Sequence, residues 1–356
     1  MRRRHPIFAM PFDGEVANAL EAEYREQSLG RRLQARRKAW ARDAMLVVTG
    51  RVRHHVANAP ATTRRMLWIY TWTTVGDAIL DLAPRRLVPK DIAIDLLIAP
   101  ALAPLFLTDR RLHAVHVDPA QCADDYDFVL LDSLRTSSLR LLAQRFARVP
   151  FATMRGHQAG ERFDRAAFAD KRLRQLFTLP PGPIEAPRLD FDPPAPRDAT
   201  AVCRIALALG ARVTRKLYPH WNDVVAALVA GWPPERPAPE FHLVGQGRPA
   251  RRQATAITVP EPSRKVSLID SGDLRKTALD IAACDAFLGV DGGLMHVAVA
   301  VGTPGLALFA GIDSRYFLRP ESTMVALHSD GELDALAPAD VAAAFLAALP
   351  RVSAGR

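Results

Sequence analysis

The chain has 356 residues, of which 49% are hydrophobic and 24% charged, so a packed globular protein with room for two domains is expected. Its three cysteines lie far apart, which argues against a disulfide framework or a structural zinc site and indicates a reducing compartment, the cytoplasm. No apolar run approaches the length of a membrane span.

The net charge of +9 is concentrated at the amino-terminal end. Residues 1–65 hold 14 Lys and Arg against 6 Asp and Glu, whereas the rest of the chain is almost neutral. We expect a basic, mostly helical arm, with one helix over residues 16–27, an interruption at Gly30 and a second helix over residues 31–52. Apolar residues among the arginines of the second helix are typical of a helix on a membrane surface, but a helix packed on the protein body would look the same. An arm of this charge could bind nucleic acid or an anionic membrane; we expect the membrane, and a cytoplasmic protein peripheral on the inner membrane.

Residues 66–178 alternate short apolar runs with helical segments, which is typical of a parallel sheet with crossover helices. The predicted strands are Met66–Thr71, Ile94–Ile98, Ala114–Val117 and Phe128–Asp132, and the predicted helices are Ala78–Leu87, Ala101–Phe106 and Ser138–Phe146. We expect this segment to be a Rossmann-like domain.

A proline-dense stretch over residues 179–200 cannot form a regular element and is predicted to connect two domains. Residues 201–335 then repeat the alternation, and residues 336–356 are predicted to form an alanine-rich helical tail. The strands of this second series are Arg204–Leu209, Phe241–Val244, Val266–Ile269, Ala286–Val290 and Gly305–Phe309, and its helices are Trp221–Val229, Leu274–Ala283 and Leu294–Val301. Two Rossmann-like halves imply a cleft, with ligands at the carboxyl ends of the strands.

The strongest motif follows the predicted strand at 286–290. It reads Asp291-Gly292-Gly293-Leu294-Met295-His296. A two-glycine turn at the start of a helix offers unpaired N–H groups and the positive end of a helix dipole, which is where phosphates bind in α/β proteins. Asp291 could accept hydrogen bonds from sugar hydroxyls, and the helix dipole favours a neutral His296. The alternative is that Asp291 caps the helix and His296 is a satisfied, partly buried histidine.

A second motif follows the first strand of the first series. It contains Thr73, Thr74, Gly76 and Asp77, and its glycine allows a tight turn before the next helix. A carboxylate at that point could take a proton from an attacking hydroxyl. It could equally do no more than cap the helix.

The corresponding loop of the second series runs from Gly210 to Trp221 and is basic. It contains Arg212, Thr214, Arg215 and Lys216. A cation here could neutralise the diphosphate of a sugar nucleotide as the bond to the sugar breaks, although any one of these residues could simply be exposed. No group of residues matches the spacing of a specific metal site, so no cofactor is expected besides a nucleotide-sugar substrate.

These three segments, in this order, resemble glycosyltransferase family 9, the ADP-heptose:lipopolysaccharide heptosyltransferases. The matching positions are Thr73-Thr74-Val75-Gly76-Asp77, then Gly210-Ala211 with Lys216 and Pro219, and then Asp291 to His296 followed by Val301-Gly302-Thr303-Pro304-Gly305-Leu306-Ala307-Leu308-Phe309. The resemblance extends from about Met66 to Pro320, and the arm before it has no counterpart in the common pattern.

The resemblance implies a GT-B fold, in which two Rossmann-like domains face each other across a cleft, and an inverting, metal-independent transfer. Asp77 would be the general base on the acceptor hydroxyl, and Lys216, with Thr214 beside it, would bind the donor phosphates. Asp291 would contact the donor sugar, while Gly292, Gly293 and His296 would contact the diphosphate. The acceptor would be a glycan or a lipid-linked lipopolysaccharide core, or alternatively a protein hydroxyl.

Several positions depart from the family pattern. Gly292 replaces the usual threonine, Met295 the usual serine, and Tyr218 the usual tryptophan, while Gln246 and the residues after it lack the common ribose-binding glutamate. These changes concern the donor site and leave the proposed base and phosphate site in place. They also keep open a noncatalytic protein of the same fold that docks on a membrane or polyanion.

Overall fold

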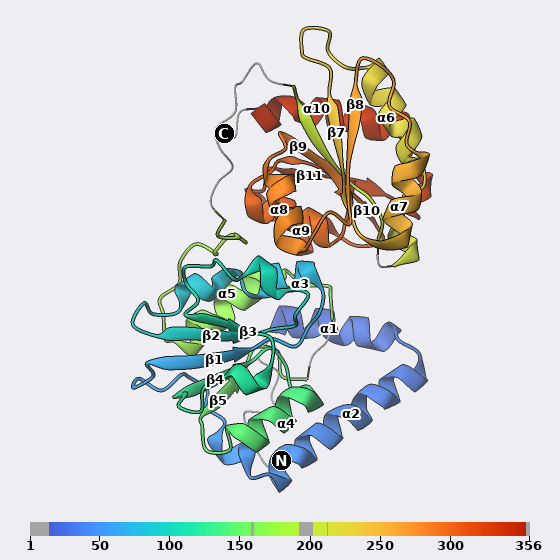
Figure 1. Cartoon of the computed structure of the whole chain (residues 1–356). Coiled ribbons are helices and arrows are strands. Elements are labelled where there is room, and N and C mark those ends of the chain that lie inside the picture. Colours follow the sequence, from blue (N-terminus) through green and yellow to red (C-terminus); the bar gives the residue numbers. More distant parts are fainter. Residues whose placement is uncertain (1–13, 158–159, 192–201, 212, 354–356) are drawn as a thin grey trace. The chain divides into compact units, whose positions relative to one another are not determined.

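The computed structural model describes residues 14–157, 160–191, 202–211 and 213–353 (Figure 1). The chain divides into two compact units, Met1–Thr73 with Leu80–Pro187, and Thr74–Ile79 with Arg188–Arg356. Residues 1–13 of the predicted arm, the linker residues 192–200 and Arg212 lie outside the described residues. Within the described residues, none of the helices combines the length and the apolar character needed to span a bilayer.

The first unit is built on a five-stranded parallel sheet. Its strands are β1 (Arg65–Ile69), β2 (Ala93–Leu97), β3 (Ala114–His116), β4 (Phe128–Leu131) and β5 (Phe151–Thr153). The sheet order is β3-β2-β1-β4-β5, so the order reverses between β1 and β4. β1 and β4 are buried almost throughout, as expected for central parallel strands with helices on both faces.

Helices cover both faces of this sheet. They include α4 (Thr136–Arg145) and α5 (Arg165–Leu176), with 3-10 turns at Ala83–Leu87, Ala103–Leu105 and Pro119–Gln121. Leu67 and Ile69 of β1 pack with Leu139 and Leu142 of α4 in one apolar cluster. On the other face, Trp68 and Tyr70 line the same small cavity as Phe168 and Ala169 of α5. Successive side chains of β1 therefore pack on opposite faces of the sheet, one against α4 and the other against α5.

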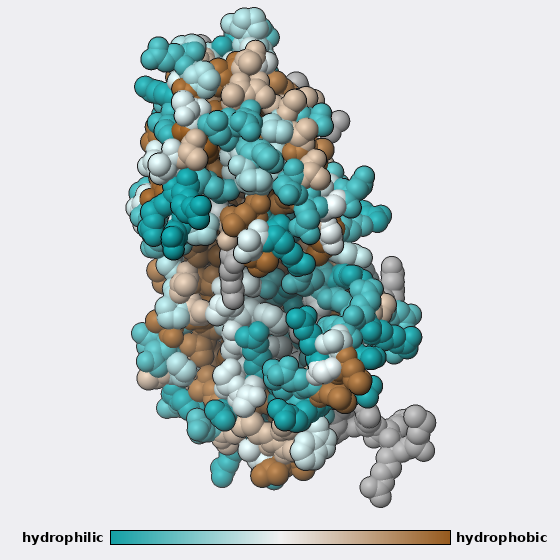
Figure 2. Space-filling view, turned by 90° about the vertical axis from the view of Figure 1, so that its right-hand side faces the viewer, coloured by the Kyte–Doolittle hydropathy of each residue, from teal (hydrophilic) through white to brown (hydrophobic). Residues whose placement is uncertain are grey.

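From residue 14 onward, the basic arm contains two α-helices, α1 (Gly14–Glu26) and α2 (Leu29–Val48), as predicted. Ser28, rather than Gly30, marks the break, because its hydroxyl accepts a hydrogen bond from the N–H of Arg31 and caps α2. The arm is joined to the first unit by buried Leu46 and by Arg51, whose guanidinium donates to the carbonyl oxygens of Ala147 and Val149. Figure 2 turns the side of Figure 1 that carries α2 toward the viewer, and there apolar groups lie among hydrophilic ones.

The second unit contains a six-stranded parallel sheet. Its strands are β6 (Arg204–Ala208), β7 (Glu240–Gly245), β8 (Arg264–Ile269), β9 (Ala286–Val290), β10 (Gly305–Ala310) and β11 (Met324–Ser329). The order β11-β10-β9-β6-β7-β8 is that of the doubly wound nucleotide-binding fold, and it reverses between β6 and β9. Two Rossmann-like α/β units are therefore present, as the sequence predicts.

The helices of the second unit are α6 (Trp221–Ala230), α7 (Gly247–Ala256), α8 (Leu274–Ala282), α9 (Gly293–Val301) and α10 (Pro338–Ser353). α10 lies within the segment predicted as a helical tail. Its Val341 and Phe345 pack with Val225 and Leu228 of α6 against apolar side chains of the sheet. α3 (Val75–Asp81) links the units along the chain, since its first residues group with the second unit and its last with the first.

Among the strands and α-helices of the described residues, β5, β11, α5 and α7 were not predicted. β5 has three residues, and β11 is an edge strand in which most side chains stay partly exposed, so neither forms a clear apolar run. α7 contains Gly247 and Pro249, which normally indicate a turn, but Pro249 lies in the first turn, where its missing N–H costs nothing. α5 is rich in charged residues, and its buried Arg165 and Asp170 break the expected polarity pattern.

Candidate functional site

The candidate site lies at the carboxyl ends of β6 and β9. These neighbouring strands stand where the order of the sheet reverses, which is where open α/β sheets bind ligands. The loop from Gly210 to His220 follows β6, and the Asp291-Gly292 turn follows β9. Two of the three predicted motifs therefore meet at one edge of one sheet.

The loop after β6 is held at both ends by Gln253 of α7. The Gln253 side chain accepts a hydrogen bond from the N–H of Gly210 and donates one to the carbonyl of Tyr218, each at 2.7 Å. Gly210 has φ of +77°, a left-handed conformation that favours glycine. Tyr218 is buried, which raises the pKa of its phenol to about 12, and its hydroxyl donates to the carbonyl of Leu336. Fixed ends leave the middle of the loop free to present side chains.

The middle of this loop is a single 3-10 turn, Thr214–Lys216, and it delivers a cation to the turn after β9. Nζ of Lys216 lies 2.6 Å from Oδ2 of Asp291, although 75 positions separate the two residues. The Lys216 side chain is 31% exposed, whereas that of Asp291 is 7% exposed. The pair thus combines a buried acceptor with a cation that remains open to solvent.

Asp291 does not act as the cap of the following helix. The N-cap of α9 is Gly292, and no side chain caps it. The helix therefore begins at the sheet edge with amide groups that no capping side chain satisfies, a local environment that favours an anion. The alternative of Asp291 as a helix cap is wrong, because its carboxylate binds Lys216 instead.

His296 lies inside α9 and is buried, with 6% of its surface exposed. Its ring meets Phe317 edge to face, with the ring centroids 5.7 Å apart. The α3 residues that belong to this unit lie beside it, because a Cβ built on Gly76 would be 2.3 Å from Cδ2 of His296. Likewise, a Cβ on Gly293 would be 2.9 Å from Cβ of Val75. Glycine at 76 and 293 thus permits close approach of backbone.

Asp77, the predicted base, immediately follows Gly76 and lies in the first turn of α3. Its carboxylate accepts a hydrogen bond from the hydroxyl of Thr74, a second predicted site residue. Asp77 and His296 are therefore carried by segments that touch at Gly76. Thr73 and Thr214 are exposed, and Leu294 is half-buried within the first turn of α9.

A hollow of about 70 Å³ opens beside the Lys216–Asp291 pair. Arg215, Gly311 and Glu332 also line it. Glu332 was not anticipated, because it follows β11, the edge strand that the sequence analysis missed. Glu332 could have been found from its position, because it follows a parallel strand at the same sheet edge as the motifs after β6 and β9.

The reversal point of the first sheet carries a buried carboxylate, Asp132, just beyond β4. Burial raises its pKa to about 6, although both carboxylate oxygens accept hydrogen bonds from the hydroxyl of Thr71, at 3.0 and 3.1 Å. Asp132 was predicted only as the end of a strand.

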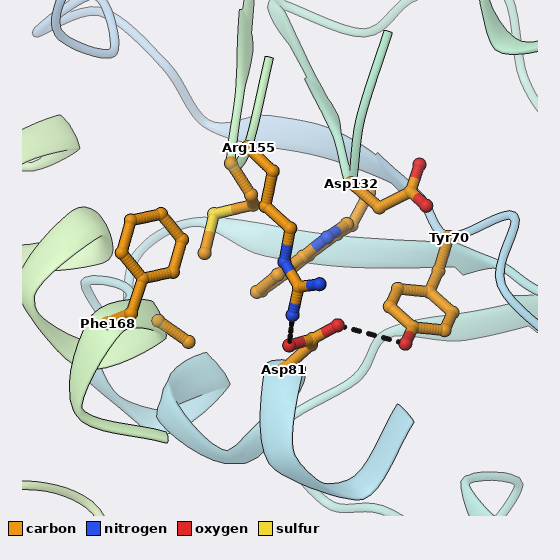
Figure 3. A pocket seen from close by; sticks show the side chains of 8 residues that line it. Tyr70, Asp81, Asp132, Arg155 and Phe168 are labelled. Carbon is orange, nitrogen blue, oxygen red and sulfur yellow. Dashed lines mark hydrogen bonds and ion pairs between the residues drawn. The ribbon is translucent and has the colours of Figure 1, made fainter. Parts of the chain in front are cut away.

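The neighbouring carboxylate, Asp81, has the opposite environment. Figure 3 shows Arg155 and Tyr70 reaching Asp81 from two sides, while the Asp132 carboxylate points away from them. Burial alone would raise the pKa of Asp81, but Arg155 and Arg165 outweigh it and lower the pKa. Nη2 of Arg165 lies 2.7 Å from Asp81. Asp81 is thus a structural ion-pair centre, whereas at Asp132 the effect of burial outweighs the hydrogen bonds and the charge of Arg135.

A protein-family model matches most of the second unit. Residues 197–329 match the model of glycosyltransferase family 9 (heptosyltransferase). No curated protein sequence matches the chain closely enough to count as a relative. Among the described residues, no group of three or more His, Cys, Asp or Glu side chains is arranged to hold a metal ion.

Several solved structures are similar to this chain. One is a glycosyl transferase of family 9 from Veillonella parvula, with 14% identity and a TM-score of 0.63 over 81% of this chain and 97% of that one. Another is ADP-heptose lipopolysaccharide heptosyltransferase II of E. coli, with 18% identity and a TM-score of 0.61 over 82% of this chain and 100% of that one. A third is E. coli heptosyltransferase WaaC with ADP, with 15% identity and a TM-score of 0.57 over 81% of this chain and 99% of that one.

These findings confirm the resemblance to glycosyltransferase family 9 and the GT-B fold class expected from the motifs. They also support the assignment of the chain as a glycosyltransferase.

Proposed function

We propose that this glycosyltransferase moves a heptose or a related sugar from a nucleotide-diphosphate donor, with ADP-heptose as the first candidate, to a hydroxyl of a glycan or lipopolysaccharide-core acceptor. The observation that carries the proposal is the Lys216–Asp291 pair at 2.6 Å, beside the uncapped start of α9 and at the reversal point of the second sheet. The resemblance to enzymes whose names specify ADP-heptose supports the choice of donor.

The donor side of the reaction needs a partner for negative charge, which grows on the diphosphate as its bond to the sugar breaks. Lys216 is suited to this because its ammonium is solvent-accessible and its loop is anchored at both ends. The N–H groups of Gly292 and Gly293 add the positive end of the α9 dipole. In the free protein Asp291 holds Lys216; with donor bound, Lys216 pairs with phosphate and Asp291 accepts hydrogen bonds from sugar hydroxyls.

The acceptor side needs a base. Asp77 takes the proton of the acceptor hydroxyl, whose oxygen bonds to the anomeric carbon as the oxygen of the diphosphate leaves from the opposite face. The products are the glycosylated acceptor, the nucleoside diphosphate and a protonated Asp77. Attack on the face opposite the diphosphate inverts the configuration of the anomeric carbon. Thr74 orients the carboxylate, and Gly76 brings its segment against His296. This chemistry requires no metal ion, because Lys216 and the α9 amides supply the positive charge.

The remaining predicted residues have supporting roles in this proposal. Thr73 precedes the base-bearing turn, Thr214 begins the turn that carries Lys216, and Leu294 lies in the first turn of α9. His296 is a hydrogen-bonding partner on the diphosphate side.

The test combines a substrate panel with a matched pair of variants. Product formation is measured with ADP-heptose and other ADP- and UDP-linked sugars, on lipopolysaccharide-core and peptide acceptors. Asp77→Asn should lower turnover by about 10²- to 10⁴-fold while donor binding stays nearly unchanged. Asp223→Asn, an exposed acid in the first turn of α6, is the control for effects of charge at a helix start.

Each outcome separates one alternative from the others. Transfer to peptide alone would make the chain a protein O-heptosyltransferase. Donor-induced thermal shifts without any product would identify a noncatalytic binding protein of the same fold. Unchanged turnover in Asp77→Asn would remove this residue from the mechanism.

A further inference from the structure

Helix α2 exposes an unusual amount of apolar surface. Eight large hydrophobic side chains stand out as exposed in the described residues, and five of them belong to this one helix. They are Leu29, Leu33, Trp40, Val47 and Val48, with 63, 56, 72, 62 and 86% of their surfaces exposed. Single exposed apolar residues are ordinary, but five on one helix indicate a binding surface.

Four of these five residues form a stripe separate from the face that packs on the protein. With about 100° of rotation per residue, Leu29, Leu33, Trp40 and Val47 fall within an arc of about 40°. The packed face, which contains buried Leu46 and the Asp43 carboxylate paired with His157 at 2.5 Å, lies roughly 90° away. The stripe is therefore not needed to attach the helix to its own unit.

The helix that carries this stripe is strongly basic. α2 contains Arg31, Arg32, Arg36, Arg37, Lys38 and Arg42 against a single acid, Asp43, which is already paired with His157. Within the part of the chain that the structure describes, none of these six cations takes part in an ion pair. Arg36 and Arg37 flank the apolar stripe, so their guanidinium groups can reach the same surface that the stripe enters.

We propose that α2 binds the surface of an anionic membrane, with the stripe from Leu29 to Val47 among the acyl chains and the flanking arginines on lipid phosphates. Charge complementarity selects this partner, because an apolar stripe flanked by Arg36 and Arg37, on a helix whose single acid is paired with His157, fits a surface that is apolar inside and negative outside. Tryptophan also prefers the interface between headgroups and acyl chains.

The attachment of α2 makes this binding consequential for the whole first unit. Arg51, just beyond the helix, is buried and donates to the carbonyls of Ala147 and Val149, and its guanidinium lies over the Phe151 ring. A helix held in this way would tether the first unit to the membrane. The inference does not depend on which sugar is transferred, since lipid binding and transfer are measured separately.

The experiment uses the full chain and lipid vesicles in a flotation assay. Vesicles of phosphatidylcholine alone should bind weakly, and vesicles that also contain phosphatidylglycerol should bind strongly, with binding that declines as salt is raised. The double variant Leu33→Ser/Trp40→Ser should weaken binding about tenfold or more, because it removes the apolar anchor from the stripe. Leu107→Ser, an exposed leucine outside the arm, is the matched control and should leave binding unchanged.

A charge variant tests the second half of the proposal. Arg36→Glu/Arg37→Glu should abolish the preference for phosphatidylglycerol, whereas Arg248→Glu/Arg252→Glu, exposed cations on α7, should not. Circular dichroism verifies that each variant is folded.

Three results would overturn the proposal. The first is vesicle binding that the stripe variant leaves unchanged. The second is a concentration-dependent dimer that forms through the stripe while vesicles stay unbound. The third is binding to an RNA oligonucleotide, sensitive to the arginine variant, by a chain that ignores vesicles.

Discussion

The two sheets of this protein share a topology but differ in what stands at their reversal points. In the second unit, Lys216 and Asp291 pair at 2.6 Å beside the free amides of α9, so the edge offers positive charge to an anion. In the first unit, Asp132 is buried with a pKa raised to about 6, and its hydrogen bonds come from a hydroxyl and from backbone amides. One fold thus supports two different chemistries, and we assign phosphate binding to the second edge.

The largest expected effect tests the positive edge. Lys216→Ala should lower kcat/KM for the donor by about 10²- to 10³-fold, because the growing charge on the diphosphate loses its ammonium partner. Lys276→Ala is the matched control, since Lys276 also pairs with an aspartate, Asp280 at 2.8 Å, but on the exposed face of α8. Equal activity of the two variants would contradict a role for Lys216 in binding the donor phosphates.

The next effect tests the negative edge through its pH dependence. Because the pKa of Asp132 is raised from 3.8 to about 6 on folding, the folded state binds the proton more tightly, and stability falls as pH rises through that window. The free energy of unfolding falls by at most about 3 kcal/mol across this range and does not fall further at higher pH. Asp132→Asn should lack this decline in urea unfolding between pH 4 and 7. Parallel curves for the variant and the unaltered protein would contradict a raised pKa for the buried Asp132 carboxylate.

A smaller effect concerns the contact between Gly76 and His296. Gly76→Ala places a Cβ 2.3 Å from the His296 ring, so the ring or the backbone must move, at a cost of about 1–3 kcal/mol. Gly30→Ala, a helical glycine with nothing near its added Cβ, should stabilise the chain by up to about 1 kcal/mol. Thermal unfolding should show a lower melting temperature for Gly76→Ala and a higher one for Gly30→Ala. A higher melting temperature for Gly76→Ala would show that the contact with His296 is absent.

The smallest effect addresses how the Lys216 loop is held. Gln253→Ala removes two hydrogen bonds that fix Gly210 and Tyr218, which should cost about 1–2 kcal/mol and raise KM for the donor more than it lowers kcat. Gln246→Ala, which removes one exposed bond to Gly272, is the comparison. Identical KM values would mean that the loop is ordered without Gln253.

Sequence patterns located most of the scaffold because the central strands are buried on both faces. β1, β4, β6, β9 and β10 appear as uninterrupted apolar runs for that reason. The edge strand β11 carries no such run, so Glu332, which it positions, escaped notice. A proline in the first turn of α7 likewise concealed the helix that holds the Lys216 loop.

The candidate site was predicted in parts but not as an arrangement. The motifs identified Lys216 and Asp291 separately, yet their pairing depends on β6 and β9 being neighbours, a property of sheet order that no local pattern contains. Asp132 could not be singled out, because its raised pKa comes from burial by residues distant in sequence. The donor, the acceptor and the catalytic roles remain predictions.

The most direct test of the central claim is the binding of ADP and of adenosine, measured by calorimetry on the unaltered protein and on Lys216→Ala. The account predicts that the variant binds ADP at least about tenfold more weakly, because a charge-assisted contact with phosphate is lost, while adenosine binds both proteins equally. An unchanged ADP affinity in Lys216→Ala would contradict a phosphate site at the reversal point of the second sheet.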